Sequence, residues 1–423
     1  MPGANRHCFR ASHAVGATRR DQRAADQLRT HTRAPTHRRS ARRSRLHYRV
    51  HDVGDRTSSP RSQTTGARFP RRTGRQGQQA IKQGTIPAMH TAKFRKLDFG
   101  VTEVDLRQEA DGITYLTAPQ PLAPYPTRLT DRLIQWAAQS PEKTLFARRE
   151  KNEDGTFGEW RHVNYKQAYE TAQHIAQGLI NRGLSVDKPV LILSENDLEH
   201  ALLALGCLMV GIPFCPASPA YSTISQDFEK LRHIAHTITP GLVFAADATR
   251  YGKAILSALS PDMEVVLTRG TLDDRTCTTF ESLCATPVTP EVQARMETVN
   301  GDTVAKFLFT SGSTKLPKAV INTQGMWCAN QQQMCQSMPV LKDVPPVLID
   351  WLPWNHTFGG NHNFGMVIYN GGTMYIDDGK PTPALIQETL RNLREIAPTV
   401  YFNVPTGFEQ IANAMKVDSV LRK

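Results

Sequence analysis

Helix-like and strand-like patterns of hydrophobic residues alternate along most of the chain. Residues 129–146 place apolar side chains at helical spacing and then, after a Ser-Pro pair, in a short strand. Residues 157–185 predict a strand, a turn and an amphipathic helix, and Gly183 suits the C-cap of that helix. The run KPVLILSEN, residues 188–196, is almost continuously apolar, as expected for a strand covered by helices on both faces.

The same alternation continues toward the C-terminus. Further helix–strand pairs are predicted at residues 197–218, 228–245 and 250–268. Two more strands are predicted at residues 304–309 and 319–321, whereas residues 271–300 are expected to form a surface connection. The repeated pairing of helix and strand predicts an α/β fold, with sheets flanked by helices.

In residues 1–88 the apolar residues follow neither helical nor strand spacing, and they are too sparse to form a core. They carry 19 Arg and 1 Lys against 4 Asp, whereas the rest of the chain carries 31 basic and 35 acidic residues. Four explanations are open: a nucleic-acid-binding arm, an organellar transit peptide, a solvated tail, or translated DNA upstream of the true start. We favour the last, a non-native disordered tail, because nearly all its basic residues are arginine and ordinary composition resumes at Met89.

The overall composition is that of a water-soluble globular protein. The 423 residues are 39% hydrophobic and 21% charged, with a mean hydropathy of −0.41. The longest apolar stretch, residues 201–215, is shorter than the roughly 20 residues that a membrane-spanning helix needs. The 7 cysteines form no C-x-x-C pair, which favours reduced thiols. We therefore expect a cytoplasmic protein without a membrane segment, and the oligomeric state stays open.

A polar loop separates the two strands predicted after residue 303. Its residues are small or hydroxylated: Thr310, Ser311, Gly312, Ser313 and Thr314. Successive backbone N–H groups in such a turn can form an anion-binding concavity, with the compact charge of Lys318 nearby. The glycine spacing does not match the common G-x-x-x-x-G-K nucleotide-binding loop. From these residues alone two interpretations stay open, a phosphate cradle and a solvent-facing polar hairpin.

The segment TSGSTKLPKAV, residues 310–320, closely resembles the signature of the acyl-adenylate-forming (AMP-binding) superfamily, which includes the acyl-CoA synthetases. In that family the loop wraps the triphosphate of ATP. The resemblance implies that ATP is bound by Thr310, Ser311, Gly312, Ser313, Thr314 and Lys318. It further implies that Thr314 contacts Mg²⁺ and that Lys318 is catalytic. The family usually has a glycine where this chain has Lys315, a change that costs about 1 kcal/mol if that position needs a positive φ.

A second segment, residues 350–381, resembles the feruloyl-CoA synthetase branch of the same superfamily. The residue that borders the acyl pocket and the phosphates in related enzymes corresponds to His356, which we expect to position the acyl carboxylate or gate access to it. The implied substrate-binding residues are Trp354, His356, Phe358, Gly359 and Gly360, with Trp351 as a further aromatic wall. We expect His362 to make a structural hydrogen bond, and Asp377 and Asp378 to form a solvated strand end.

The reaction that this resemblance implies has two steps. A carboxylate attacks the α-phosphorus of ATP to give an acyl-adenylate and pyrophosphate, and the thiol of coenzyme A then displaces AMP. ATP and coenzyme A are therefore the expected co-substrates, with Mg²⁺ as the expected cofactor. By the same resemblance the acid is aromatic, a hydroxycinnamate such as ferulate.

Several parts that members of the superfamily have do not occur before Lys423. These are a Tyr-Gly-x-Thr-Glu motif, a ribose-binding Asp, a hinge and a small C-terminal domain with an adenylation lysine. Residues 89–423 are thus expected to be a partial N-terminal AMP-binding domain, and an inactive fragment. One alternative is a non-catalytic protein that binds a nucleotide and an aryl acid. A nucleic-acid-binding protein is supported by residues 1–88 alone.

Overall fold

The computed structural model describes residues 97–101, 103–152, 154–273, 275–310 and 316–422, so the expectations for residues 1–88 lie outside the described part. The described chain divides into two compact units. The described part of the smaller unit, residues 106–116, belongs to a two-stranded sheet of β1 (Asp105–Gln108) and β2 (Thr114–Thr117). All elements named below belong to the larger unit. No helix in the described ranges is long and apolar enough to cross a membrane.

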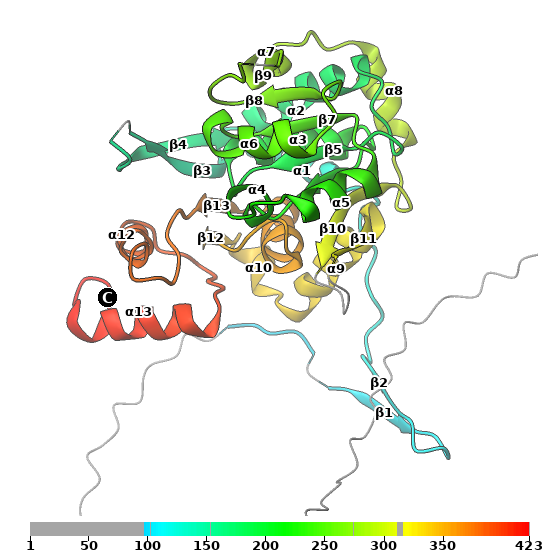
Figure 1. Ribbon diagram of the computed structural model, residues 1–423. Helices are drawn as coiled ribbons and strands as arrows, with labels where there is room; N and C mark the ends of the chain where they lie inside the picture. The colour runs from blue at the N-terminus through cyan, green and yellow to red at the C-terminus, as the bar shows by residue number, and fades with distance from the viewer. Residues whose placement is uncertain (1–96, 102, 153, 274, 311–315, 423) are drawn as a thin grey trace, which may run out of the picture. The chain divides into compact units, whose positions relative to one another are not determined.

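A seven-stranded sheet forms one layer of the larger unit, with its strands in the order β11, β10, β6, β5, β7, β8, β9 (Figure 1). Neighbouring strands from β10 to β9 pair in parallel, and β11 runs antiparallel to β10 at the edge. Their bounds are β5 Val190–Leu193, β6 Phe214–Pro216, β7 Leu242–Ala245, β8 Glu264–Leu267, β9 Cys277–Thr279, β10 Val304–Thr310 and β11 Lys318–Thr323.

Helices cover both faces of this sheet, and strand β5 shows why its sequence is apolar throughout. Val190 and Ile192 belong to one buried cluster, whereas Leu191 and Leu193 belong to a second. Successive side chains of a strand point to opposite faces, so each cluster lies on its own side of the sheet. The helices that contribute to these clusters are α2 (Tyr165–Asn181) and α3 (Leu198–Met209) on one side, and α5 (Glu229–Ile238) and α6 (Ala248–Ala258) on the other.

A second sheet has four strands in the order β12, β13, β3, β4. The first three are parallel, and β4 pairs antiparallel with β3. Their bounds are β3 Thr144–Lys151, β4 Phe157–Asn164, β12 Val347–Asp350 and β13 Thr373–Ile376. Every residue of α3 is buried, as expected for a helix with neighbours on all sides. Its cluster also includes Phe146 of β3 and Met374 of β13, so one core joins α3 to the second sheet.

The remaining elements complete the layers around the two sheets. They are α1 (Thr130–Gln139), α4 (Ala220–Thr223), α7 (Phe280–Cys284), α8 (Pro290–Thr298), α9 (Gln324–Ser337), α10 (Val340–Asp343), a π-helical turn η1 (Phe358–Asn363), α11 (Phe364–Tyr369), α12 (Ile386–Glu395) and α13 (Pro405–Val417).

The expected α/β architecture is confirmed, as are the expected strands on either side of the polar loop. Gly183 follows α2 with φ +65°, the left-handed conformation predicted for a C-cap. The expectation for residues 271–300 was wrong, because this stretch contains β9, α7 and α8. Phe280 and Leu283 of α7 and Val292 of α8 are buried. A three-residue strand has too short a pattern to detect, and β9 becomes visible only through its pairing with β8.

Candidate functional site

A cavity of about 300 Å³ opens where strands of both sheets end. Residues that follow β5 and β6 of the larger sheet line it, and so do residues that follow β12 and β13 of the smaller sheet. In open α/β sheets, ligands bind outside the carboxyl ends of the strands. The lining residues are Ser194, Glu195, Asn196, Ser218, Pro219, Ala220, Thr223, Ile224, Trp351, Pro353, Asn355, Asp377, Asp378 and Lys380.

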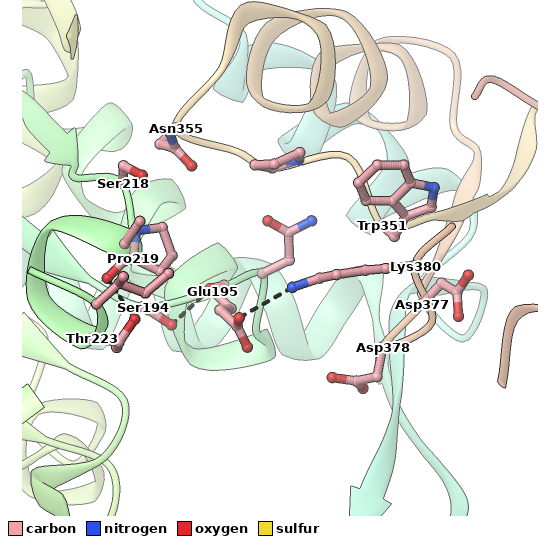
Figure 2. A pocket seen from close by; sticks show the side chains of 14 residues that line it. Ser194, Glu195, Ser218, Pro219, Thr223, Trp351, Asn355, Asp377, Asp378 and Lys380 are labelled. Carbon is pink, nitrogen blue, oxygen red and sulfur yellow. Dashed lines mark hydrogen bonds and ion pairs between the residues drawn. The ribbon is translucent and has the colours of Figure 1, made fainter. Parts of the chain in front are cut away.

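Ionic contacts connect the loops on opposite sides of this cavity. Figure 2 shows Lys380 extending across it toward Glu195, at an Nζ–Oε1 distance of 3.3 Å. Arg250 pairs with the same carboxylate at 3.1 Å. Burial acts to raise the pKa of Glu195, but Arg250 and Lys380 outweigh it and hold that pKa below its usual value. The carboxylate is therefore charged at neutral pH.

A second connection is built on Arg148 of β3. Its guanidinium binds Asp197, the N-cap residue of α3, at 2.7 Å, and Asp378, after β13, at 2.7 and 3.0 Å. Neighbouring Asp377 is buried and accepts hydrogen bonds from Gly379 N (2.8 Å), Thr389 Oγ1 (2.6 Å) and Asn392 Nδ2 (2.9 Å). The expectation that Asp377 and Asp378 form a solvated strand end was wrong, because both carboxylates have partners in other elements.

The two strands expected on either side of the polar loop are present as β10 and β11, which pair antiparallel. Thr310, at the end of β10, pairs with Lys318, the first residue of β11. The Lys318 side chain is exposed, and the exit of the loop is held by a 2.9 Å contact between His233 Nε2 and the carbonyl oxygen of Pro317. The predicted ATP-binding residues Ser311, Gly312, Ser313 and Thr314 lie outside the described residues. Their assignment, and that of Mg²⁺ to Thr314, stays a prediction.

The second predicted segment places its residues in different surroundings. His356 is exposed, next to Asn355, which lines the 300 Å³ cavity. Neither His356 nor Lys318 lines that cavity. Phe358 is half-buried in an aromatic cluster with His362 and Phe402, whose ring centres are 4.7 to 5.9 Å apart. The Nδ1 atom of His362 also lies 2.7 Å from Asn363 Oδ1, which is the structural hydrogen bond expected of it.

Trp351 and Trp354, the two tryptophans predicted to line the substrate pocket, lie in different places. Trp351 lines the 300 Å³ cavity, and its Nε1 donates to Asn403 Oδ1 at 3.2 Å. Trp354 is 3% exposed and packs against Phe146, His200 and Phe364. It lines a separate cavity of about 10 Å³, room for roughly one water molecule. The assignment of Trp354 to substrate binding stays a prediction that requires this small cavity to enlarge.

Gly359 and Gly360 are buried within η1, and close packing explains both. A Cβ atom on Gly359 would lie 2.2 Å from the carbonyl oxygen of Leu352, and one on Gly360 would lie 2.1 Å from that of Trp354. These glycines therefore let the turn approach the preceding backbone. Their predicted contact with a planar ligand is a separate role that stays a prediction.

Two buried titratable residues were missed by sequence reasoning. Lys306, in the middle of β10, is fully buried and lines the 10 Å³ cavity together with His200. Burial lowers the pKa of His200 to about 4. A lone lysine within the apolar run VAKFLF was the available signal for Lys306. The signal for His200 was weaker, because the sequence does not separate a structural from a functional histidine in an apolar helix.

Asp350, at the end of β12, is a third buried titratable residue. Its Oδ1 atom accepts hydrogen bonds from Leu352 N (3.2 Å) and Asn363 Nδ2 (2.9 Å), whereas Oδ2 has no partner among the described residues. Burial raises its pKa to about 7. Within the described residues, no group of three or more His, Cys, Asp or Glu side chains could hold a metal ion.

Comparisons with known proteins connect this geometry to a family. The family described as AMP-binding enzyme matches residues 133–422. Among curated proteins, "Long-chain-fatty-acid--CoA ligase 2" of Schizosaccharomyces pombe is 22% identical over 62% of this chain and 39% of that protein. "Fatty acyl-CoA synthetase B" of Dictyostelium discoideum is 23% identical over 67% of this chain and 42% of that protein. The chain thus spans about two fifths of the length of these relatives.

Solved structures share the fold. A putative long-chain-fatty-acid CoA ligase from Rhodopseudomonas palustris superposes with a TM-score of 0.55 at 18% identity, covering 70% of this chain and 67% of that one. The McyG A-PCP structure, complexed with phenylalanyl-adenylate, gives a TM-score of 0.54 at 16% identity, covering 71% and 44%. Since the family match spans well over half of the sequence, including both motif segments, the chain belongs to the AMP-binding enzyme family.

Proposed function

We propose that the protein activates a carboxylic acid with ATP, forming an acyl-adenylate and pyrophosphate, and that the acyl group then passes to the thiol of coenzyme A. The observation that carries this proposal is the family match over residues 133–422, which spans both the hairpin and the His356 segment. The relatives are named as CoA ligases and synthetases, which supports a thiol as the second acceptor.

The hairpin is the proposed binding site for the triphosphate. Adenylation requires charge compensation on the phosphates and in-line positioning of the carboxylate. Exposed Lys318 can bring its ammonium to a ligand without losing an existing partner among the described residues. The described residues offer no cluster of acids for a metal. We therefore expect Mg²⁺ to arrive with the triphosphate and to be held mainly by phosphate oxygens, beside Thr314.

The 300 Å³ cavity suits a different part of the reactants. The one cation among the described residues of its lining, Lys380, is already paired with Glu195, and the Asp378 carboxylate is paired with Arg148, so the lining offers no unpaired positive charge for a polyphosphate. Apolar surface from Ile224 and the indole of Trp351 completes the lining. We propose that it receives an uncharged part of a reactant, such as an amide-bearing arm or the acyl group.

Two classes of acid are candidates. The aromatic cluster of Phe358, His362 and Phe402 next to His356 favours an aromatic acid such as a hydroxycinnamate, because aromatic rings pack well edge to face. The names of the curated relatives favour a long-chain fatty acid instead. We place the aromatic acid first, because the cluster belongs to this chain.

Pyrophosphate–ATP exchange on the full chain tests the proposal, with ferulate, hexadecanoate and no acid in parallel. Acid-dependent exchange that Lys318→Ala reduces is the expected result, and the preferred acid identifies the class. Calorimetry with ATP and with ferulate separates the alternatives. Binding of both without exchange would favour a non-catalytic binding protein, and binding of neither would overturn the proposed function.

A further inference from the structure

The strand that leads into the hairpin contains a buried lysine. The side chain of Lys306 is 1% exposed, and its Nζ donates a hydrogen bond to the carbonyl oxygen of Gly360 at 2.7 Å. Nζ lies 3.6 Å from the centre of the Trp327 ring and 5.6 Å from that of Phe214. A fully buried lysine is unusual, because removing an ammonium group from water is strongly unfavourable.

The surroundings of Lys306 favour its uncharged form. Within the described part of the chain, no carboxylate forms an ion pair with it, and burial lowers its pKa well below the usual range. The buried titratable neighbour, His200, contacts the carbonyl oxygen of Glu195 through Nδ1 at 3.1 Å and supplies no negative charge. An uncharged amine keeps N–H donors, so it can still bind a carbonyl oxygen.

The acceptor of this hydrogen bond belongs to the π-helical turn η1. Turns of this kind are rare, and they are frequently found at functional sites. The next carbonyl of the turn, that of Asn361, accepts from Trp327 Nε1 and from Gln331 Nε2, each at 2.9 Å. Side chains from β10 and α9 thus hold two consecutive carbonyls of η1.

Gly360, whose carbonyl oxygen binds Lys306, is also hydrogen-bonded to His356. Its backbone N–H donates to the carbonyl oxygen of His356 at 2.8 Å. On its other side, the carbonyl oxygen of Trp354 leaves no room even for a Cβ atom. The turn is therefore confined between Lys306 and Trp354. Four residues beyond Lys306, β10 reaches Thr310, where the hydroxylated loop begins.

We propose that Lys306 is a positioning residue, whose hydrogen bond to Gly360 fastens η1 to β10 and so fixes His356 relative to the strand that leads into the hairpin. Its effect on rate rests on the function proposed above, whereas the structural contact does not. A lysine suits this role because its long stem carries one compact donor. An arginine would bring a permanent charge into the core, and a methionine would fill the space without a donor.

Hydrogen–deuterium exchange on the full chain tests the contact directly. The test variant is Lys306→Met, and the matched control is Lys253→Met, which changes an exposed lysine of α6. Exchange of the amides of residues 358–364 should become about fivefold faster in Lys306→Met, while β5 and the control stay unchanged. Unchanged exchange at η1 in a folded Lys306→Met protein would overturn the proposal.

A measurement on the unmodified chain decides the question even where Lys306→Met does not fold. In ¹³C-lysine NMR spectra recorded from pH 6 to 9, one Cε–Hε signal should be displaced by the Trp327 ring and should have the chemical shift of an uncharged amine. A spectrum in which every lysine is charged and undisplaced would contradict the proposal.

The consequence for rate needs a readout that a purely structural role would not change. In pyrophosphate exchange, Lys306→Met should lower kcat about tenfold and leave the KM for ATP nearly unchanged, because only the position of His356 is disturbed. An unchanged kcat in a protein with a loosened η1 would refute the positioning role. If the parent chain shows no exchange, the proposed function fails, but the deuterium and NMR results still decide the Lys306 contact.

Discussion

The two predicted halves of the site, the β10–β11 hairpin and the η1 segment, differ in what holds them in place. At the hairpin, Lys318 begins β11 with an exposed side chain, and the exit of the loop is held by a partly buried contact between His233 and Pro317. The η1 turn is held from inside the core, by Lys306 and Trp327. Lys318 can therefore be replaced at little cost in stability, whereas the turn depends on residues that are themselves part of the core.

This difference predicts that substitutions will separate activity from stability. Exposed residues of the hairpin should affect ligand chemistry alone. Buried residues around η1 and the 300 Å³ cavity should affect stability, and those around η1 should also affect activity through the position of His356. The following substitutions test this distinction, beginning with the largest expected effect.

Arg148→Met should produce the greatest loss of stability, about 3–5 kcal/mol in the free energy of unfolding, because it leaves Asp197 and Asp378 without their buried partner. Urea denaturation measures it. The matched control is Arg107→Met, which removes a pair between Glu109 and an arginine side chain that is 68% exposed. The control should lose less than about 1 kcal/mol. Equal losses of unfolding free energy in both variants would show that the ion pairs of Arg148 stabilise the fold no more than an exposed pair does.

Lys318→Ala should lower the rate of pyrophosphate exchange about 100-fold, since it removes the positive charge that we propose stabilises the triphosphate. Its free energy of unfolding should stay within about 0.5 kcal/mol of the parent value, because the side chain is exposed. Lys253→Ala is the control for general loss of positive charge. Full activity in Lys318→Ala would remove the hairpin from the proposed mechanism.

Gly360→Ala should destabilise the protein by about 1–3 kcal/mol, because the new Cβ would lie 2.1 Å from the carbonyl oxygen of Trp354 and the backbone must shift. Thermal unfolding followed by circular dichroism checks this. Gly301→Ala is the matched control, since its Cβ would meet the nearest atom, Gly325 Cα, at 3.7 Å. An unchanged unfolding free energy in Gly360→Ala would mean that η1 has room to move away from the Trp354 carbonyl oxygen.

Asp350→Asn should change how stability depends on pH. The carboxyl pKa is about 7 in the folded protein and near 3.8 when unfolded, so the folded state binds the extra proton between these values. Stability from this group is thus present below pH 3.8 and is lost as pH rises through 7, at about 1 kcal/mol per pH unit near pH 6. Urea titrations at pH 5.5 and 6.5 should show this decrease in the parent but not in Asp350→Asn. Parallel decreases in both proteins would assign the effect to other groups.

Much of the fold was predictable because the signals were local. The apolar run at 190–193 identified a strand buried on both faces, and the alternation of helix and strand identified the α/β class. The hydroxylated loop was identified by residues that are adjacent in the chain. Residues 271–300 were misjudged, since short elements such as β9 are stabilised by pairing rather than by their own pattern.

The class of fold, the two motif segments and the family resemblance could all be inferred from the sequence, because each depends on residue types at short spacing. The contacts of the buried polar residues became known only from the folded chain. Lys306 finds its acceptor 54 residues away, and Arg148 finds Asp378 at a separation of 230. Burial and long-range pairing set the charge state of such groups, and no local pattern encodes which distant partner a residue finds.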